Sequence, residues 1–167
     1  TRGTGAVDLQ VKRSTATMIG SGNYSVVAGG RNNTASQNLA AVSGGYGNVA
    51  DAVAANIGGG KNNSVSSAAT YSTISGGYQA KADKYAQFVR AAGKFSTQGD
   101  AQSSDFVLRA STTNATATEM FLDGSAAKLV LANDTTWAYM ILIVARRSDS
   151  DGESAAWIFE GCIDRGV

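Results

Sequence analysis

The side chains that could perform catalysis are few in this chain of 167 residues, which has no histidine and a single cysteine, Cys162. Without histidine, a Ser-His-Asp triad is impossible and the commonest metal ligand is missing. Hydrolysis of a glycosidic bond needs only two carboxylates. The candidates are Asp105, Glu119, Asp123, Asp149, Asp151, Glu153, Glu160 and Asp164. Asp123 and Asp151 precede glycine in turn signals, and the others are typical of solvated strands and loops. The sequence therefore predicts no catalytic residue and no enzyme activity.

The stretch from Asp149 to Glu153 concentrates the oxygen ligands that a calcium loop uses. It lacks the ligand spacing of such a loop and its closing glutamate. The single cysteine is typical of a small buried hydrophobe, and it cannot form a disulfide within the chain. We therefore predict no metal ligand and no cofactor, and the sequence leaves open only an ion held between chains.

Sugar binding requires exposed aromatic rings beside planar polar groups, because rings stack on sugar faces while arginine and aspartate bind hydroxyls and charged substituents. This pattern occurs after a long apolar run. The candidate receptor-binding residues are Arg146, Arg147, Asp149, Asp151 and Trp157. Both arginines follow an expected strand and lead into a loop, which favours exposure. The neighbouring rings of Trp137, Tyr139 and Phe159 are expected in the core.

Charge and composition exclude several classes of partner. The chain has 14 basic and 13 acidic residues and a net charge of +1, so we expect neither nucleic acid nor an anionic membrane as a partner. The longest apolar run, 137–145, is about half the length of a membrane-spanning helix. The first residues show no signal peptide. Since a starting methionine is missing, we expect a fragment of a longer polypeptide.

A repeat organises the first half of the chain. A β-branched residue stands two positions before a glycine pair at Val27, Val42, Ile57 and Ile74, with spacings of 15, 15 and 17 residues. The repeated glycines and asparagines are Gly29, Gly30, Gly44, Gly45, Gly59, Gly60, Gly76, Gly77, Asn33, Asn48 and Asn63. A disordered glycine-rich linker would not keep such constant intervals, so the repeat predicts an ordered structure.

Each repeat has the length of one coil with two short strands and two turns. The β-branched residue favours an extended strand and is expected to point inward. The repeated asparagines tolerate the left-handed region and hydrogen-bond their own backbone, so we expect them at a corner. We expect a bulky residue at Gly44 or Gly59 to disrupt assembly, on the reasoning that the coil has no room for a Cβ. Such coils must stack, because none buries its own face.

A different module follows the repeat. We predict a glycine-rich β-repeat shaft over residues 1–83 and an antiparallel β module over residues 84–167. Its candidate strands are 85–90, 104–109, 118–122, 128–131, 136–145 and 156–164, with hairpin turns at 123–125 and 151–153. The strand at 136–145 has apolar residues on both faces, so we expect both faces to be covered.

The repeats at 24–36 and 71–80 resemble the head repeats of trimeric autotransporter adhesins (the YadA type) and the related repeats of bacteriophage tail fibres. The stretches 81–85, 99–102, 121–124 and 143–147 are similar to a module that follows such repeats in phage tail proteins. The resemblance covers about 7–165 and departs from the repeat pattern at 38–40, where we expect a less regular coil.

This resemblance implies an all-β homotrimer with parallel chains, whose stacked β-coil shaft, similar to a β-roll or β-helix, precedes an antiparallel tip. It implies a non-catalytic part of a virion tail fibre that binds a bacterial surface polysaccharide or an outer-membrane receptor, with no insertion into the membrane. For Tyr46 and Tyr78, which follow glycine pairs, the sequence leaves two roles open, sugar binding and packing between chains. Two alternatives stay open at this stage, a bacterial trimeric adhesin head and a capsule-depolymerising tailspike.

Overall fold

The structure, a computed structural model, describes residues 1–114, 116–148 and 152–166. These residues form strands, turns and bends but no helix. The strands are β1 (Val7–Asp8), β2 (Val26–Val27), β3 (Thr34–Ala35), β4 (Ala41–Val42), β5 (Val49–Ala50), β6 (Asn56–Ile57), β7 (Ser64–Val65), β8 (Thr73–Gly77), β9 (Lys81–Ala82), β10 (Phe88–Ala91), β11 (Gln102–Asp105), β12 (Thr135–Arg146) and β13 (Ser154–Arg165). The chain divides into two compact units, Thr1–Leu129 and Val130–Val167.

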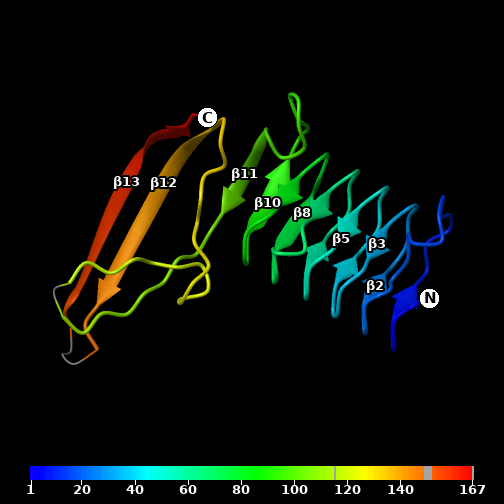
Figure 1. Ribbon diagram of the computed structural model, residues 1–167, viewed down its shortest axis with the longest axis horizontal. Coiled ribbons are helices and arrows are strands. Elements are labelled where there is room, and N and C mark those ends of the chain that lie inside the picture. The colour runs from blue at the N-terminus through cyan, green and yellow to red at the C-terminus, as the bar shows by residue number, and fades with distance from the viewer. Residues whose placement is uncertain (115, 149–151, 167) are drawn as a thin grey trace. The chain divides into compact units, whose positions relative to one another are not determined.

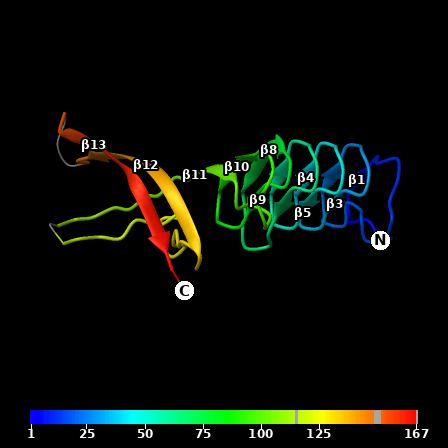
Figure 2. The ribbon, with the colours of Figure 1, turned by 90° about the horizontal axis from the view of Figure 1, so that it is seen from above.

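The first unit contains a β-solenoid of about six turns, which confirms the predicted all-β fold of stacked coils. One wall is a sheet in the order β1-β2-β4-β6-β8-β10-β11, and the other is a sheet in the order β3-β5-β7-β9 (Figures 1 and 2). All pairs are parallel except β10 with β11, which is antiparallel. The parallel stack continues past residue 83, because β10 pairs with β8.

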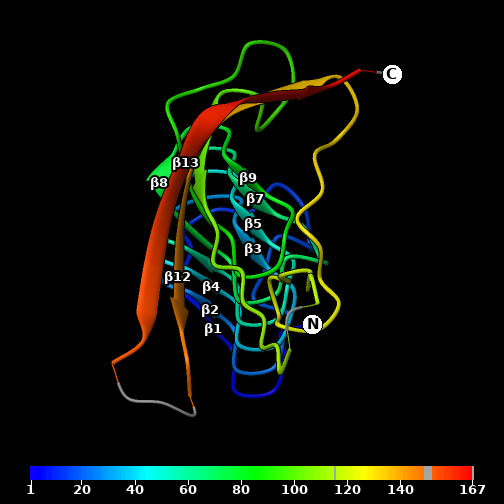
Figure 3. The same ribbon diagram turned by 90° about the vertical axis from the view of Figure 1, so that its left-hand side faces the viewer.

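The core of the solenoid contains one column of inward-pointing side chains from each wall, together with buried alanines between the walls. The predicted inward residues Val27, Val42, Ile57 and Ile74 are fully buried, and Val89 of β10 continues the column. The facing wall contributes the small side chains Ala35, Ala50, Val65 and Ala82, which are also fully buried. Figure 3 looks nearly along the stack and shows β3, β5, β7 and β9 behind one another. Each buried branched side chain stabilises the stack by about 1.5–3 kcal/mol.

The repeated asparagines form a buried ladder through the stack. The Asn48 side-chain oxygen accepts a hydrogen bond from the Asn63 backbone N–H at 3.0 Å, and Asn33 does the same for Asn48. The Asn48 amide nitrogen donates to the carbonyls of Gly44 (2.9 Å) and Gly60 (3.0 Å), so one side chain bonds its own coil and the next. The repeat needs asparagine there because only a side-chain amide supplies an acceptor and two donors at that reach.

The corner prediction for these asparagines was displaced by one residue. The left-handed residues at this corner are Asn32, Gly47, Asn62 and Gln79, with φ between 55° and 66°. Each immediately precedes the residue whose backbone N–H enters the asparagine ladder or, for Asn32, the contact with Gln10. We call this corner, which follows each glycine pair, the first corner. The asparagines themselves point inward, where unpaired backbone groups would otherwise be costly.

Glutamine side chains complete the ladder at both ends. The Gln10 side-chain oxygen accepts from the Asn33 N–H at 2.8 Å, and its nitrogen donates to the Met18 and Asn33 carbonyls. At the other end, where the Ala80 N–H donates to the Asn63 side-chain oxygen, the Gln98 side-chain nitrogen donates to the carbonyls of Asn62 (2.7 Å) and Ala80 (2.9 Å). These bonds satisfy backbone groups that have no asparagine beside them.

A second corner, on the other side of each coil, is built from left-handed residues that are not glycine. They are Tyr24, Leu39, Ala54, Tyr71 and Ala86, with φ between 50° and 62°. The backbone N–H of Leu39 donates to the Asn23 carbonyl of the preceding coil at 2.9 Å, and the other four make the equivalent bond. Leu39 therefore fits the coil as its neighbours do, and the irregularity predicted at 38–40 is wrong.

The glycine pairs differ in what they tolerate. A Cβ on Gly44 would have no heavy atom within 4 Å, so the expectation that the coil has no room at this position is wrong. Gly59 is also open, although its φ of 142° is a backbone conformation that side chains disfavour. The close approach occurs at the second glycine, because a Cβ on Gly45 would lie 2.1 Å from the Gly60 carbonyl oxygen.

The strands predicted after the repeat were found in part. Strand β10 overlaps the prediction at 85–90, and β12 and β13 confirm those at 136–145 and 156–164. The predicted strands 118–122 and 128–131 are absent from the described structure, in which this region makes a single bridge between Arg109 and Phe121. The predicted hairpin turn there is a turn capped by Asp123, whose carboxylate accepts from the backbone N–H groups of residues 125–127, each at 2.9 Å.

The second unit is a two-stranded antiparallel ribbon. Strands β12 and β13 pair over their whole length, from Thr135 opposite Arg165 to Arg146 opposite Ser154. Tyr139 lies across Gly161, and a Cβ on this glycine would be 3.0 Å from the Tyr139 hydroxyl oxygen. The sequence predicted cover for both faces of β12, yet much of this ribbon's apolar surface is exposed in the single chain.

Candidate functional site

The tip of the β12–β13 ribbon holds the two arginines that the sequence singled out. Arg146 is the last residue of β12, and Arg147 follows it. The Arg147 backbone N–H donates to the Glu153 carbonyl at 3.1 Å, and its guanidinium forms an ion pair with the Glu153 carboxylate at 2.5 Å. The other two predicted tip residues, Asp149 and Asp151, lie outside the described residues.

Trp157, the remaining candidate, lies on β13 opposite Ile143 and is 49% exposed. Side chains alternate between the two faces of a strand, and directly paired residues share a face. Ile143 and Arg146 are three positions apart, so Trp157 and Arg146 belong to opposite faces of the ribbon. The structure therefore brings the two arginines to one end of the ribbon but does not place Trp157 in the same surface as Arg146.

The two faces of the ribbon differ in composition. One face carries the aromatic and branched side chains, which are Trp137, Tyr139, Ile141, Ile143, Trp157, Phe159 and Ile163. We call it the aromatic face. The opposite face carries the exposed side chains Met140, Leu142, Val144 and Ile158 together with Glu160 and Asp164. An exposed, continuous apolar surface of this kind marks an interaction site.

The candidate carboxylates among the described residues have structural roles or solvated positions. Hydrogen bonds from the backbone N–H groups of Ala126, Ala127 and Ser125 hold the pKa of the Asp123 carboxyl well below its usual range. Glu119 pairs with Lys128 at 2.8 Å, both side chains being more than half exposed. Within the described residues, no three His, Cys, Asp or Glu side chains gather in a metal-binding group. The same part of the chain holds no helix long and apolar enough to span a membrane.

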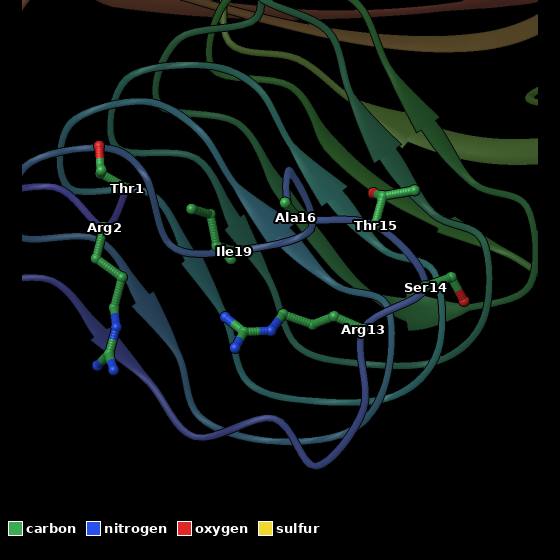
Figure 4. A pocket seen from close by; sticks show the side chains of 7 residues that line it. All are labelled: Thr1, Arg2, Arg13, Ser14, Thr15, Ala16 and Ile19. Atoms are coloured by element: carbon green, nitrogen blue, oxygen red, sulfur yellow. The ribbon is translucent and has the colours of Figure 1, made fainter.

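A shallow depression lies at the first coils of the solenoid. It is lined by Thr1, Arg2, Arg13, Ser14, Thr15, Ala16 and Ile19, which come from the first two residues and the loop before β2 (Figure 4). Arg13 already pairs with Asp8 at 3.3 Å, and the Asp8 side chain is only 2% exposed. Since the depression is open and its Arg13 is occupied, it does not have the enclosed shape of a small-molecule site.

The first corner carries charged and aromatic side chains in register, a surface that the sequence did not single out as a site. Lys12, Arg31, Tyr46, Lys61 and Tyr78 occupy one position in successive coils, joined by parallel bridges. The signal was present in the repeat, because the last four of these residues directly follow the glycine pairs that end at 30, 45, 60 and 77. The chain was also compared with family models, curated proteins and solved structures, and none of them matches it.

Proposed function

We propose that this chain is part of a viral tail fibre that attaches to a bacterial surface as a homotrimer, binding without catalysis. The observation that carries the proposal is the exposed β12–β13 ribbon. An isolated two-stranded ribbon is marginally stable in water, so its apolar faces need cover. A stacked-coil shaft joined to a strand module that needs further chains is the organisation implied by the family resemblance of the repeats.

Additional copies of the same chain are a sufficient cover for the aromatic face. In a closed cyclic assembly each copy offers the same patch, so a single sequence supplies every partner. Three ribbons with their aromatic faces turned toward one axis would form a shared core of tryptophan, tyrosine, phenylalanine and isoleucine. Ile158 at 68% exposure and Met140 at 75% lie on the opposite face, which this arrangement turns away from the axis.

The purified chain is expected to sediment as a trimer of its 17.1 kDa protomer at micromolar concentration. The double variant I141K/I143K is expected to sediment as a monomer, because it would place two charges per chain in the shared apolar core. The matched control T113K/A117K adds the same charge at exposed positions and is expected to stay trimeric. Sedimentation velocity measures all three proteins, and a monomeric wild-type chain would contradict the assembly.

Attachment is tested with whole cells and isolated surface polysaccharides from candidate bacterial hosts, with release of reducing sugars measured in parallel. Saturable binding without sugar release is the expected result. Release of oligosaccharides would instead favour a depolymerising tailspike. Absence of binding to every host surface would contradict attachment by this part of the fibre.

The double variant R146A/R147A is expected to weaken binding to the host surface by about tenfold or more, because charge-assisted hydrogen bonds to the receptor are lost. Its melting temperature is expected to change little, since the Arg147–Glu153 pair joins two side chains that are each 56% exposed. The control K94A/K128A removes the same charge elsewhere and should bind normally. Unchanged binding of R146A/R147A would show that the two arginines do not belong to the receptor site.

A further inference from the structure

The first corner of the solenoid presents one long polar side chain per coil. Lys12, Arg31, Tyr46, Lys61 and Tyr78 are all exposed, with Tyr46 39% and Tyr78 41% accessible. We call these five residues the corner row. Neighbouring strands in a sheet are about 4.8 Å apart, so the row extends for roughly 19 Å along the solenoid.

Cations and rings in the corner row contact one another in sequence. The Arg31 guanidinium lies 5.5 Å from the centre of the Tyr46 ring, and the Lys61 ammonium lies 5.9 Å from the same ring. Lys61 is also 5.6 Å from the centre of the Tyr78 ring. Each contact is a cation–π interaction, which restrains a long side chain that would otherwise be free. Restrained donors bind a ligand with a smaller entropy cost.

The corner row lacks the counter-charges that would neutralise it. Among the described residues, the ion pairs involve Arg13, Lys84, Lys128 and Arg147, and none involves Lys12, Arg31 or Lys61. The charged groups of the row are ammonium and guanidinium ions, which are donors only, and each tyrosine adds a phenol hydroxyl. A restrained line of donors without carboxylates is complementary to an extended anionic ligand.

We propose that the corner row binds an acidic polysaccharide that lies along the solenoid. Arg31 and Lys61 are two coils apart, which places these cations about 10 Å from each other. Carboxylates on an acidic polysaccharide recur at intervals of one or more sugars, and the sugar hydroxyls between them suit the intervening tyrosines. Measured along the axis of a duplex, the phosphates of each strand recur every ~3.4 Å, a closer spacing than the row offers.

Symmetry favours an outward position for the corner row. In a threefold assembly, a corner turned toward the axis would meet two identical copies of its own cations, and like charges at close range repel. The second corner carries exposed Tyr24, Leu39 and Tyr71 instead, whose apolar side chains suit a contact between chains. The ligand proposal rests on the proposed attachment function, because a bacterial surface is where the fibre would meet such polymers.

The test compares the wild-type chain of 167 residues with R31Q/K61Q for binding to immobilised alginate, a polyuronate. The variant is expected to bind about tenfold or more weakly and to lose part of the salt dependence of binding. The charge-matched control is K81Q/K84Q, which changes Lys81 in β9 of the other wall and Lys84 after that strand. It should bind as the wild type does. The variant R31K/K61R keeps both charges and should retain most of the binding.

Neutral dextran and a single-stranded DNA oligonucleotide serve as comparison ligands. Equal binding of alginate by wild type and R31Q/K61Q would overturn the proposal. Binding of dextran by the wild type as tight as its binding of alginate would also overturn it. Tighter binding of DNA than of alginate would identify the ligand as a nucleic acid instead of a polysaccharide. If R31Q/K61Q loses alginate binding while the wild-type chain binds no host surface, the corner row is a polysaccharide site and the attachment function is contradicted. If R146A/R147A weakens host binding and R31Q/K61Q does not, the attachment function stands and the proposed role of the corner row is overturned.

Discussion

Gly45→Ala is expected to destabilise the solenoid severely, whereas Gly44→Ala, one residue earlier, is expected to leave it nearly unchanged. A Cβ on Gly45 would lie 2.1 Å from the Gly60 carbonyl oxygen and 2.8 Å from the Asn48 amide nitrogen. Both belong to the bonded framework of the stack, so neither withdraws without breaking hydrogen bonds. Gly45 also has a φ of 86°, which adds a backbone cost for any residue with a side chain.

The steric and backbone costs together amount to about 3–5 kcal/mol at Gly45. Thermal unfolding followed by circular dichroism would measure the difference between the two variants. Gly44→Ala is the matched control, because it adds the same methyl group at the same corner with nothing within 4 Å. Similar melting temperatures for the two variants would contradict the close packing of successive coils at the second glycine.

Asn48→Leu is the second substitution with a large expected effect. The side chain is fully buried, and its removal would leave the Asn63 backbone N–H without its acceptor and the Gly44 carbonyl without its donor. Leucine has a similar size but no polar atom, so the loss of stability comes chiefly from unpaired groups. The expected cost is about 3 kcal/mol or more, because buried donors and acceptors lose their partners in a water-free interior.

The control for this ladder substitution is Asn56→Leu, at the outward position of β6, where the side chain is only partly buried. Its effect is expected to stay within about 0.5 kcal/mol. Amide hydrogen exchange gives a second, local measurement, because the Asn63 N–H should lose protection in Asn48→Leu before the whole stack unfolds. Protection equal to that of the wild type would mean that the Asn48 side chain is not the acceptor.

The sequence by itself determined that the first half of the chain is a stack of coils. Val27, Val42, Ile57 and Ile74 recur at nearly constant spacing, and a spacing of this length allows two short strands per coil and no pair of helices. Their inward position follows from the same regularity, because equivalent residues of stacked coils lie above one another and must all face the same side of the wall. The long strands β12 and β13 could also be predicted from the sequence, since a short continuous apolar run is typical of a buried strand.

The conformations at the corners were decided by the stack as a whole. Tyr24, Leu39 and Tyr71 adopt the left-handed region, which their own preferences oppose. They do so because their backbone N–H groups bond the preceding coil, a gain that appears only when the coils are in register. For the same reason the sequence could not separate Gly44, which faces open space, from Gly45, which faces the next backbone.

For the candidate binding surfaces, too, the sequence determined the local features and only the tertiary structure decided which residues share a surface. The sequence indicated that Arg146 and Arg147 end a strand, and this local property needs no tertiary contact. Only the pairing register shows that Trp157 belongs to the opposite face from Arg146, because a shift by one residue would reverse the faces. Likewise, Arg31 and Lys61 are 30 positions apart in the chain, and only coil stacking brings them into one row, with Tyr46 between them.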